Sequence, residues 1–191
     1  MIDLLELPGF LATDECAAIR EALSSLAGGA ATVLSPDAHG SVAPSVRRTT
    51  RLACPAELSE RIQLRLMSRK AEIEAHFDVA LSSCESAQFL RYETGDFFVP
   101  HQDGNTPLVH DHSRFRRVSV VIFLSTASPE PTPETYGGGS LVFHGSYTEP
   151  TPTASVNPDP GTLIAFRSET THEVTAVTHG ERYTIVSWFR G

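Results

Sequence analysis

The sequence predicts a mainly β fold, an antiparallel sandwich or barrel with two helices packed on one face. Short runs rich in Val, Ile, Phe, Tyr and Thr fill residues 86–190, and Pro/Gly turns separate several of them. Residues 13–77 show apolar residues at helical spacing instead. The 191 residues suit a single domain, with helical support over about residues 1–80 and a barrel core over about residues 85–190.

Two helices are expected in the N-terminal part. The first covers TDECAAIREALSSLAGG (residues 13–29), with Thr13 as its candidate N-cap and Gly28-Gly29 at its end. The second covers AELSERIQLRLMSRKAEIEAHF (residues 56–77). The polar, turn-rich segment between them is an expected loop that carries the basic cluster RRTTR (residues 47–51).

The strands are expected in the C-terminal part. Two Pro-rich segments, residues 128–139 and 148–161, are interpreted as loops between them. The six expected strands are SAQFLRY, RRVSVVIFLS, GGSLVFH, GTLIAF, HEVTAV and RYTIVSWFR.

Composition and charge argue against several classes of protein. The net charge of −8 is opposite in sign to that of most nucleic-acid binders. No apolar run reaches the roughly 18 residues of a membrane span, and the N-terminus lacks the basic residues of a signal peptide. Three scattered cysteines favour reduced thiols in a cytoplasmic protein. We therefore expect neither nucleic acid nor membrane as a partner.

The stretch YETGDFFVPHQDGN (residues 92–105) places His101 and Asp103 two positions apart. Residues i and i+2 of a strand lie on the same side, so both side chains can bind one metal ion. An imidazole nitrogen and a carboxylate oxygen are both good ligands for a divalent first-row metal. Pro100 lacks an N–H and is expected to end or bend the strand pairing just before them.

Other histidines are weighed as ligands. His76 lies at the end of the second helix, and HDH (residues 110–112) lies in a polar loop that favours a solvated turn. Three later histidines are candidates for the third ligand. His172 is favoured because it begins a strand, whereas a glycine follows both His144 and His179 and indicates turns, an exposed one for His144.

Two histidines and one carboxylate form the ligand set of non-haem Fe(II) oxygenases. This set leaves room at the metal for a 2-oxo acid and O2. Arg182 follows His172 by ten residues, which fits a barrel in which both face inward. An arginine binds a carboxylate through two parallel hydrogen bonds and stays charged when buried. Thr184, on the same strand face, is an additional donor.

The motifs YETGDFFVPHQD, RRVSVVIFLS, GGGSLVFHG, NPDPGTLIAFRSETTHEVTAV and GERYTIVSWFR occur in the order typical of one enzyme family. On these motifs, which cover residues 88–190, the chain resembles the prolyl 4-hydroxylase-like branch of the Fe(II)/2-oxoglutarate-dependent dioxygenases. The resemblance implies a double-stranded β-helix, a jelly-roll (cupin-like) barrel with N-terminal helices packed on its major sheet.

The resemblance also implies site residues and cofactors. His101, Asp103 and His172 would bind Fe(II), and Arg182 would bind the distal carboxylate of 2-oxoglutarate. O2 would be the second cosubstrate, and ascorbate is an optional cofactor. Because Asp103 is present where related halogenases lack a carboxylate, hydroxylation is favoured over halogenation.

Three aromatic residues have a place in this resemblance. Tyr92 matches a tyrosine that points into the cofactor pocket, with a core position as the alternative. Trp188 matches a pocket-wall tryptophan that contacts substrate, and core packing explains it equally well. Phe123 stands where several relatives have a tyrosine, so one hydrogen bond to 2-oxoglutarate is missing or comes from Thr184 or another residue.

The predicted reaction is hydroxylation of an unactivated C–H bond, with release of succinate and CO2. By resemblance the default substrate is a prolyl residue in a peptide or protein, and a free amino acid or small metabolite is the alternative. A jelly roll that only binds a metal or ligand is the alternative from another class. Residues 33–50 form either a solvated surface or a mobile lid in which Arg47 or Arg48 contacts substrate.

Overall fold

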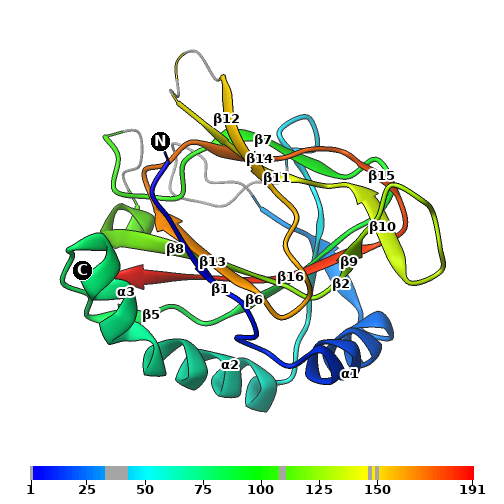
Figure 1. Cartoon of the computed structure of the whole chain (residues 1–191), viewed down its shortest axis with the longest axis horizontal. Helices are drawn as coiled ribbons and strands as arrows, with labels where there is room; N and C mark the ends of the chain where they lie inside the picture. Colours follow the sequence, from blue (N-terminus) through cyan, green and yellow to red (C-terminus); the bar gives the residue numbers. More distant parts are fainter. Residues whose placement is uncertain (1, 33–42, 108–110, 146–147, 149–150) are drawn as a thin grey trace.

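The computed structural model describes residues 2–32, 43–107, 111–145, 148 and 151–191 (Figure 1). Two β-sheets face each other and form a flattened barrel, and the helices lie below the larger sheet in this view. The chain is mainly β, with N-terminal helices packed on the major sheet, as the sequence predicts. None of the helices in the described residues is long and apolar enough to span a membrane.

Within the described ranges, three α-helices rather than the expected two support the major sheet. Helix α1 (Thr13–Ser24) begins at Thr13, and Ala12 holds the N-cap position without a side-chain cap, so Thr13 as N-cap is wrong. The second expected helix is broken into α2 (Ala56–Ser68) and α3 (Lys70–Phe77). At the break, the Arg69 N–H bonds the carbonyls of Leu66 and Met67, which is a tighter turn than that of an α-helix.

The major sheet has the strand order β1-β13-β8-β16-β6-β4-β2, and β5 pairs with β16. Its central strands β8 and β16 are the longest in the described structure and pair antiparallel along most of their length. The bounds are β1 (Leu4–Leu7), β2 (Gly28–Ala30), β4 (Thr50–Leu52), β5 (Ser83–Cys84), β6 (Gln88–Tyr92), β8 (Arg116–Phe123), β13 (Leu163–Arg167) and β16 (Arg182–Arg190).

The minor sheet has the order β12-β11-β14-β7-β3, and a small sheet β15-β10-β9 lies at one end of the barrel. Strands β10 and β12 fall inside the two segments expected to be loops, and most of the shorter strands were not predicted. A 3-10 helix, His112–Phe115, precedes β8. The bounds are β3 (Arg47–Arg48), β7 (Phe97–His101), β9 (Thr126–Ala127), β10 (Thr135–Gly138), β11 (Leu141–His144), β12 (Pro152–Val156), β14 (His172–Val174) and β15 (Val177–His179).

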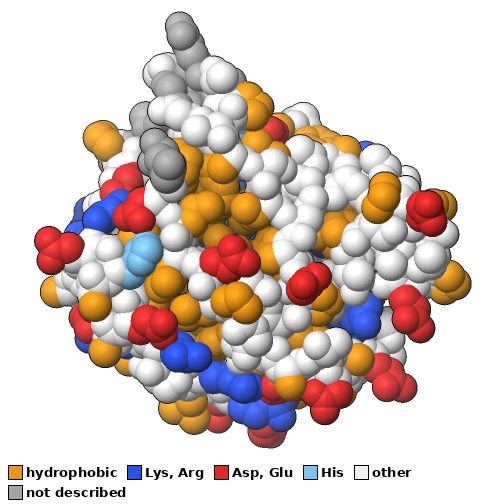
Figure 2. All heavy atoms as spheres, in the orientation of Figure 1, with side chains coloured by type: hydrophobic (Ala, Val, Ile, Leu, Met, Phe, Trp, Pro, Cys, Tyr) orange, Lys and Arg blue, Asp and Glu red, His pale blue; other side chains and the backbone are white. Residues whose placement is uncertain are grey.

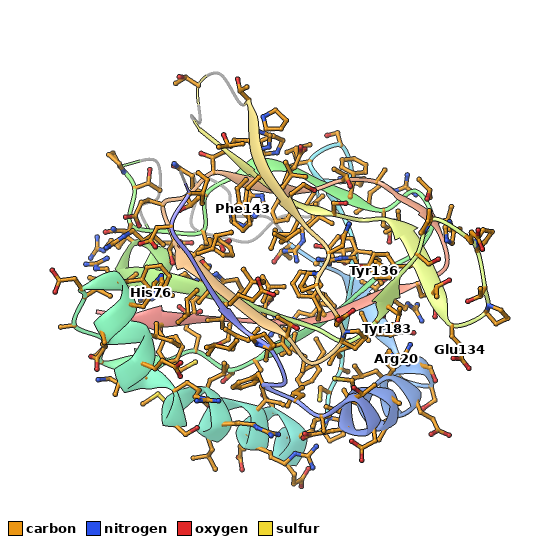
Figure 3. All side chains as sticks on the ribbon, viewed as in Figure 1. Arg20, His76, Glu134, Tyr136, Phe143 and Tyr183 are labelled. Carbon is orange, nitrogen blue, oxygen red and sulfur yellow. The ribbon has the colours of Figure 1, made fainter. Side chains whose placement is uncertain are left out.

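Strand alternation divides the apolar side chains between two cores. On β8, Val118 and Ile122 pack against the helices, while Val121 and Phe123 face the barrel interior. Phe143 of β11 lies between the two sheets (Figure 3). Burial of this kind stabilises a protein by roughly 25 cal/mol per Å² of apolar surface. The barrel interior is not apolar throughout, because polar side chains interrupt it at one pocket.

The outer face of the helices is charged. Lys and Arg side chains gather over α2 (Figure 2), where Arg61 and Arg65 lie 3.7 and 2.7 Å from the carboxylate of Glu15 on α1. Ion pairs this exposed contribute little to stability, about 0–1 kcal/mol each. The helices are therefore held on the sheet mainly by their apolar faces.

Candidate active site

Strands β7 and β14 bring two histidines together. His101 and His172 are directly opposite each other in the antiparallel register, and their ring centroids lie 4.2 Å apart. The register shifts between His172 and Val174, which pairs with Phe98, so β7 carries an extra residue there. Pro100 lies inside this irregularity, which agrees with the expected bend, although β7 continues through Pro100 to His101.

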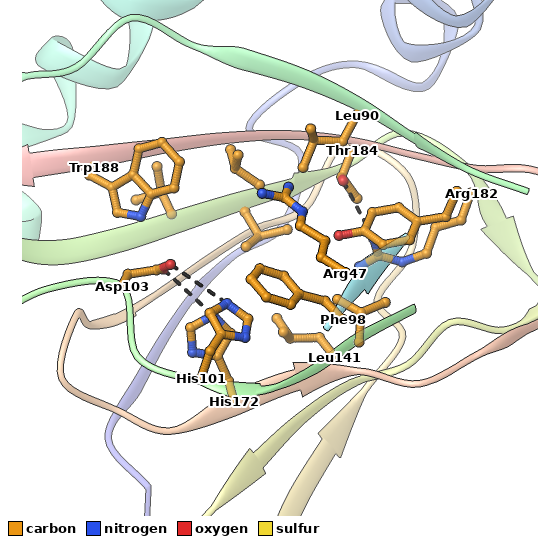
Figure 4. A pocket seen from close by; sticks show the side chains of 15 residues that line it. Arg47, Leu90, Phe98, His101, Asp103, Leu141, His172, Arg182, Thr184 and Trp188 are labelled. Carbon is orange, nitrogen blue, oxygen red and sulfur yellow. Dashed lines mark hydrogen bonds and ion pairs between the residues drawn. The ribbon is translucent and has the colours of Figure 1, made fainter. Parts of the chain in front are cut away.

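Asp103 completes a three-residue cluster just beyond the end of β7. Its Oδ1 lies 3.7 Å from His101 Nε2, and its Oδ2 lies 3.5 Å from His172 Nε2 (Figure 4). One ligand atom from each of the three residues lies within 4.8 Å of the others. Ser119 donates a 2.7 Å hydrogen bond to Asp103 Oδ2, and the Asp103 N–H donates to the Ser168 carbonyl. The carboxylate is therefore held in place from both its side chain and its backbone.

Both histidines present Nε2 to the centre of the cluster. Each Nδ1 lies 2.9 Å from a backbone carbonyl, that of Val99 for His101 and that of Thr170 for His172. A carbonyl only accepts, so each Nδ1 carries a hydrogen, which leaves Nε2 as the nitrogen whose lone pair can bind a metal. This tautomer is the one that a metal ion needs.

Burial shapes the protonation states of the cluster. Burial and the neighbouring His172 lower the pKa of His101 to about 3, so the ring is neutral at physiological pH. Burial alone would raise the pKa of Asp103, but the charges of His172 and His101 outweigh it and lower that pKa. At physiological pH the cluster therefore offers a neutral His101 ring and an ionised Asp103 carboxylate beside His172, and two imidazoles with one carboxylate suit a divalent first-row metal.

Arg182 lies in the same pocket and is 1% exposed. Its guanidinium carbon lies 5.2 Å from the ring centres of both Tyr92 and Phe123. NH1 donates to the Thr184 hydroxyl at 3.4 Å, whereas Nε and NH2 have no hydrogen-bond partner within the described structure. A buried cation with free donors is costly unless an anion pairs with it.

One face of β16 lines the pocket from end to end. Arg182, Thr184, Val186 and Trp188 alternate with residues that face the helices, and all four contact the pocket. The Trp188 indole lies beside Asp103 and helps to lower the pKa of that carboxylate. The structure thus brings together most of the predicted site residues.

Phe123 faces Arg182 from β8, opposite Thr184 in the strand register. This is the place where a tyrosine hydroxyl would reach the same anion as the guanidinium. The Thr184 hydroxyl accepts a hydrogen bond from Arg182, so it lies where the sequence predicts an additional donor.

The two arginines of β3 lie in different environments. Arg47 lines the pocket, and its guanidinium carbon lies 4.7 Å from the centre of the Phe98 ring. Arg48 has a side chain that is 52% exposed and lies 3.7 Å from Asp96. Residues 33–42 of the expected lid lie outside the described residues.

None of the other histidines in the described residues joins the cluster. His144 ends β11 as expected, but it is 4% exposed, so the prediction of an exposed turn is wrong; its Nε2 lies 3.2 Å from Glu173. His179 lies next to Gly180, whose φ of +69° fits the expected turn. His76 pairs with Asp3, and His112 begins the 3-10 helix. His110 lies outside the described residues.

Sequence reasoning missed two parts of the site. Phe98 stacks on His101 with ring centroids 3.4 Å apart, and its position three residues before the histidine was the only signal. Glu85 binds Arg116 through hydrogen bonds of 3.0 and 2.8 Å, and Arg116 covers the Trp188 ring and donates to the Asp103 carbonyl. No local motif connects Glu85 to the pocket, because the three elements meet only in the folded sheet.

A barrel whose pocket holds two histidines, a carboxylate and a buried arginine with two donors left free by the described residues fits the class of non-haem Fe(II) oxygenases. A sequence model of the 2OG-Fe(II) oxygenase superfamily matches residues 87–190, more than half of the chain. The chain therefore belongs to the 2OG-Fe(II) oxygenase superfamily and is an Fe(II)- and 2-oxoglutarate-dependent dioxygenase.

Similar proteins fit this assignment. A PKHD-type hydroxylase of Paracoccus denitrificans is 29% identical over 97% of this chain and 77% of the relative. A Pseudomonas putida prolyl-4-hydroxylase structure has a TM-score of 0.68 at 21% identity, covering 100% of this chain and 93% of the other. A Trichoplax adhaerens prolyl hydroxylase, solved with a hypoxia inducible factor peptide fragment, has a TM-score of 0.69 at 16% identity, covering 100% and 84%. These structures confirm the jelly-roll barrel.

Proposed function

We propose that this protein hydroxylates an unactivated C–H bond, binding Fe(II) through His101, Asp103 and His172 and 2-oxoglutarate through Arg182. The observation that carries the proposal is the meeting of a His-Asp-His cluster and an unpaired, buried guanidinium in one pocket. A non-catalytic binding module has no need of both features. Residues 1–191 would act as one domain, since a single core joins the helices to the barrel.

The residues present fit an Fe(II) ion. Two imidazoles and a carboxylate converge, and the backbone carbonyls of Val99 and Thr170 fix the ring orientation. Ser119 holds one carboxylate oxygen, which limits rotation of Asp103. When bound, Fe(II) with 2-oxoglutarate supplies the O2-derived oxidant for the C–H bond, and succinate and CO2 are released. The task of the protein is to orient the ligands and exclude water.

The residues also fit 2-oxoglutarate. The free Nε and NH2 donors of Arg182 suit the two oxygens of its distal carboxylate. The rings of Tyr92 and Phe123 flank the guanidinium and shield it from water, which strengthens the attraction of an anion. The pocket that holds Arg182 and the three proposed metal ligands is also lined by apolar residues of β6, β8 and β14, namely Leu90, Val121 and Val174. These side chains suit the aliphatic carbons of 2-oxoglutarate.

A prolyl residue of a peptide or protein is our proposed substrate. Support comes from the prolyl hydroxylases of similar fold, one of them solved with a peptide fragment. A free amino acid is the second candidate, and the cation Arg47 in the pocket favours it. A cytoplasmic location is proposed from the three free thiols of Cys16, Cys54 and Cys84.

The test combines binding and turnover. Purified protein should bind Ni(II), an inert substitute for Fe(II), and then 2-oxoglutarate, both measured by calorimetry. With Fe(II) and O2 it should form succinate and add one oxygen to a member of a panel of prolyl peptides and free amino acids, measured by mass spectrometry. An Asp103→Ala variant is the control. Protein that binds neither Ni(II) nor 2-oxoglutarate would refute the proposal.

A further inference from the structure

A second arginine, Arg47, enters the pocket from the minor sheet. In Figure 4 its guanidinium lies among the pocket-lining side chains, on the side of Trp188 and Thr184. The ring of Phe98 supports it from below at 4.7 Å, and Phe98 in turn stacks on His101. Arg47 NH1 donates a 3.1 Å hydrogen bond to the Thr32 carbonyl, which fixes one nitrogen of the guanidinium. The cation is thus directed at the pocket and held there.

Arg47 has no carboxylate partner among the described residues. Its Nε is buried without a hydrogen bond, whereas the neighbouring Arg48 faces Asp96 at the surface. A role limited to joining β3 to β7 does not explain this position. An apolar side chain stacked on Phe98 would join the strands equally well, without a buried and unpaired donor. An unpaired guanidinium in a pocket is the feature that, for Arg182, indicates an anion.

The charges of the filled site indicate one further anion. Iron contributes two positive charges, and Arg47 and Arg182 contribute one each. Asp103 contributes one negative charge and 2-oxoglutarate two, while the histidines are neutral. One positive charge remains, and it lies at Arg47 because Arg182 is matched by the distal carboxylate. A neutral amide substrate would leave this charge unpaired in a pocket of low dielectric constant.

We propose that Arg47 binds a carboxylate of the substrate and selects substrates that carry one close to the hydroxylated carbon. The inference rests on the proposed function and narrows its substrate class. Two sources supply this chemistry. One is the terminal carboxylate of a free amino acid or of a C-terminal residue, and the other is an Asp or Glu side chain beside the target residue in a longer chain.

Binding to the Ni(II)- and 2-oxoglutarate-loaded protein tests the inference without turnover. The probes are matched pairs: L-proline and L-prolinamide, N-acetyl-L-proline and its amide, and blocked Asp-Pro-Gly and Asn-Pro-Gly peptides. We expect at least one carboxylate probe to bind about tenfold more tightly than its amide, as a buried charge-assisted contact should. The pair that discriminates identifies the source of the carboxylate.

The preference should disappear in Arg47→Gln and persist in part in Arg47→Lys. Arg51→Gln, which removes an exposed charge of the same basic cluster, is the matched control and should keep it. Equal binding of carboxylate and amide in every pair would overturn the inference, as would a preference that survives Arg47→Gln. Weakened binding of 2-oxoglutarate itself in Arg47→Gln would also overturn it. Failure of the proposed function is distinct, since it appears as absent Ni(II) or 2-oxoglutarate binding in the wild type.

Discussion

At the scale of single residues, two backbone carbonyls orient the histidine rings of the His101–Asp103–His172 cluster without help from a metal ion. The Val99 and Thr170 carbonyls occupy Nδ1 of His101 and His172, so the protein does not have to select the tautomer on binding. Fixed ligand orientation of this kind typically accounts for 10- to 100-fold in metal affinity. His144 shows the contrast, because it is equally buried but lies beside Glu173 and outside the cluster.

His172→Ala should abolish turnover and weaken Ni(II) binding at least tenfold, because one of three ligands is lost. Calorimetry and succinate formation measure the two effects. His144→Ala is the matched control, a buried histidine on the neighbouring strand, and should retain metal binding. The opposite pattern would make His144 the third ligand.

Arg182→Ala should raise the KM for 2-oxoglutarate more than tenfold and that for the hydroxylated substrate much less. Truncating one partner of a buried charge-assisted contact costs about 2–5 kcal/mol. Initial rates of succinate formation at varied 2-oxoglutarate measure the change. Phe123→Tyr is a variant in the opposite direction: a hydroxyl facing Arg182 should lower this KM. An unchanged KM in Arg182→Ala would place the cosubstrate elsewhere.

The residue scale is also where the sequence is most informative about the site. The spacing of His101 and Asp103 predicts that both side chains lie on the same side of the chain. The choice of His172 and Arg182 rested on their places in expected strands and on the resemblance to the family. The burial of His144 was not predictable. Its position before Gly145 indicates a turn, and its side chain becomes buried only when the sheet has folded.

At the scale of elements, long strands were predictable and short ones were not. β8 and β16 have enough apolar residues to show their period, whereas β3 and β9 contain two residues each and exist only because a neighbouring strand pairs with them. The break at Arg69 escaped prediction because apolar residues continue at helical spacing across it. Apolar side chains on both sides of the break reach the core under the sheet, Leu66 before it and Ile73 and Phe77 after it.

Glu85 connects three elements and makes stability depend on pH. Burial raises its pKa, but hydrogen bonds and charges of Arg116 and Arg190 outweigh burial and lower the pKa below the ordinary 4.5. A lowered carboxyl pKa contributes stability above the unfolded-state value, and this contribution is lost as the pH falls through the folded-state value. We expect Glu85→Gln to reduce the free energy of unfolding above pH 4.5, with a smaller difference from wild type at lower pH.

Urea unfolding across this pH range measures the effect. Glu72→Gln is the control, since Glu72 pairs with Arg69 at an exposed site where both side chains are more than 40% exposed. A difference between Glu85→Gln and wild type that stays constant with pH would show that the ion pairs of Glu85 do not titrate as proposed.

At the scale of the whole molecule, Arg47 and Arg48 should keep the oxidation of 2-oxoglutarate coupled to hydroxylation of the substrate. Replacing both Arg47 and Arg48 with alanine should leave Ni(II) and 2-oxoglutarate binding nearly unchanged. It should raise the fraction of 2-oxoglutarate consumed without hydroxylated product, because substrate is no longer held when O2 reacts. Succinate and product measured together give this fraction. A double variant with wild-type coupling would show that neither arginine holds the substrate during oxidation.

Arg182, Thr184, Val186 and Trp188 alternate along β16, so this strand fixes the distances between the groups that line the pocket. In the proposed site, one end of the strand carries Arg182, the 2-oxoglutarate anchor, and the other end carries Trp188 beside the proposed metal ligand Asp103. A strand rises about 3.4 Å per residue, so the separation of these ends is set by covalent geometry. A strand in the middle of a sheet cannot gain a residue without disrupting its pairing with both neighbouring strands. β3 is a two-residue edge strand, so a change in it disturbs the pairing with one neighbouring strand only. Relatives of this enzyme should therefore diverge in substrate by rebuilding the edge that carries Arg47, while the distance from anchor to metal stays constant.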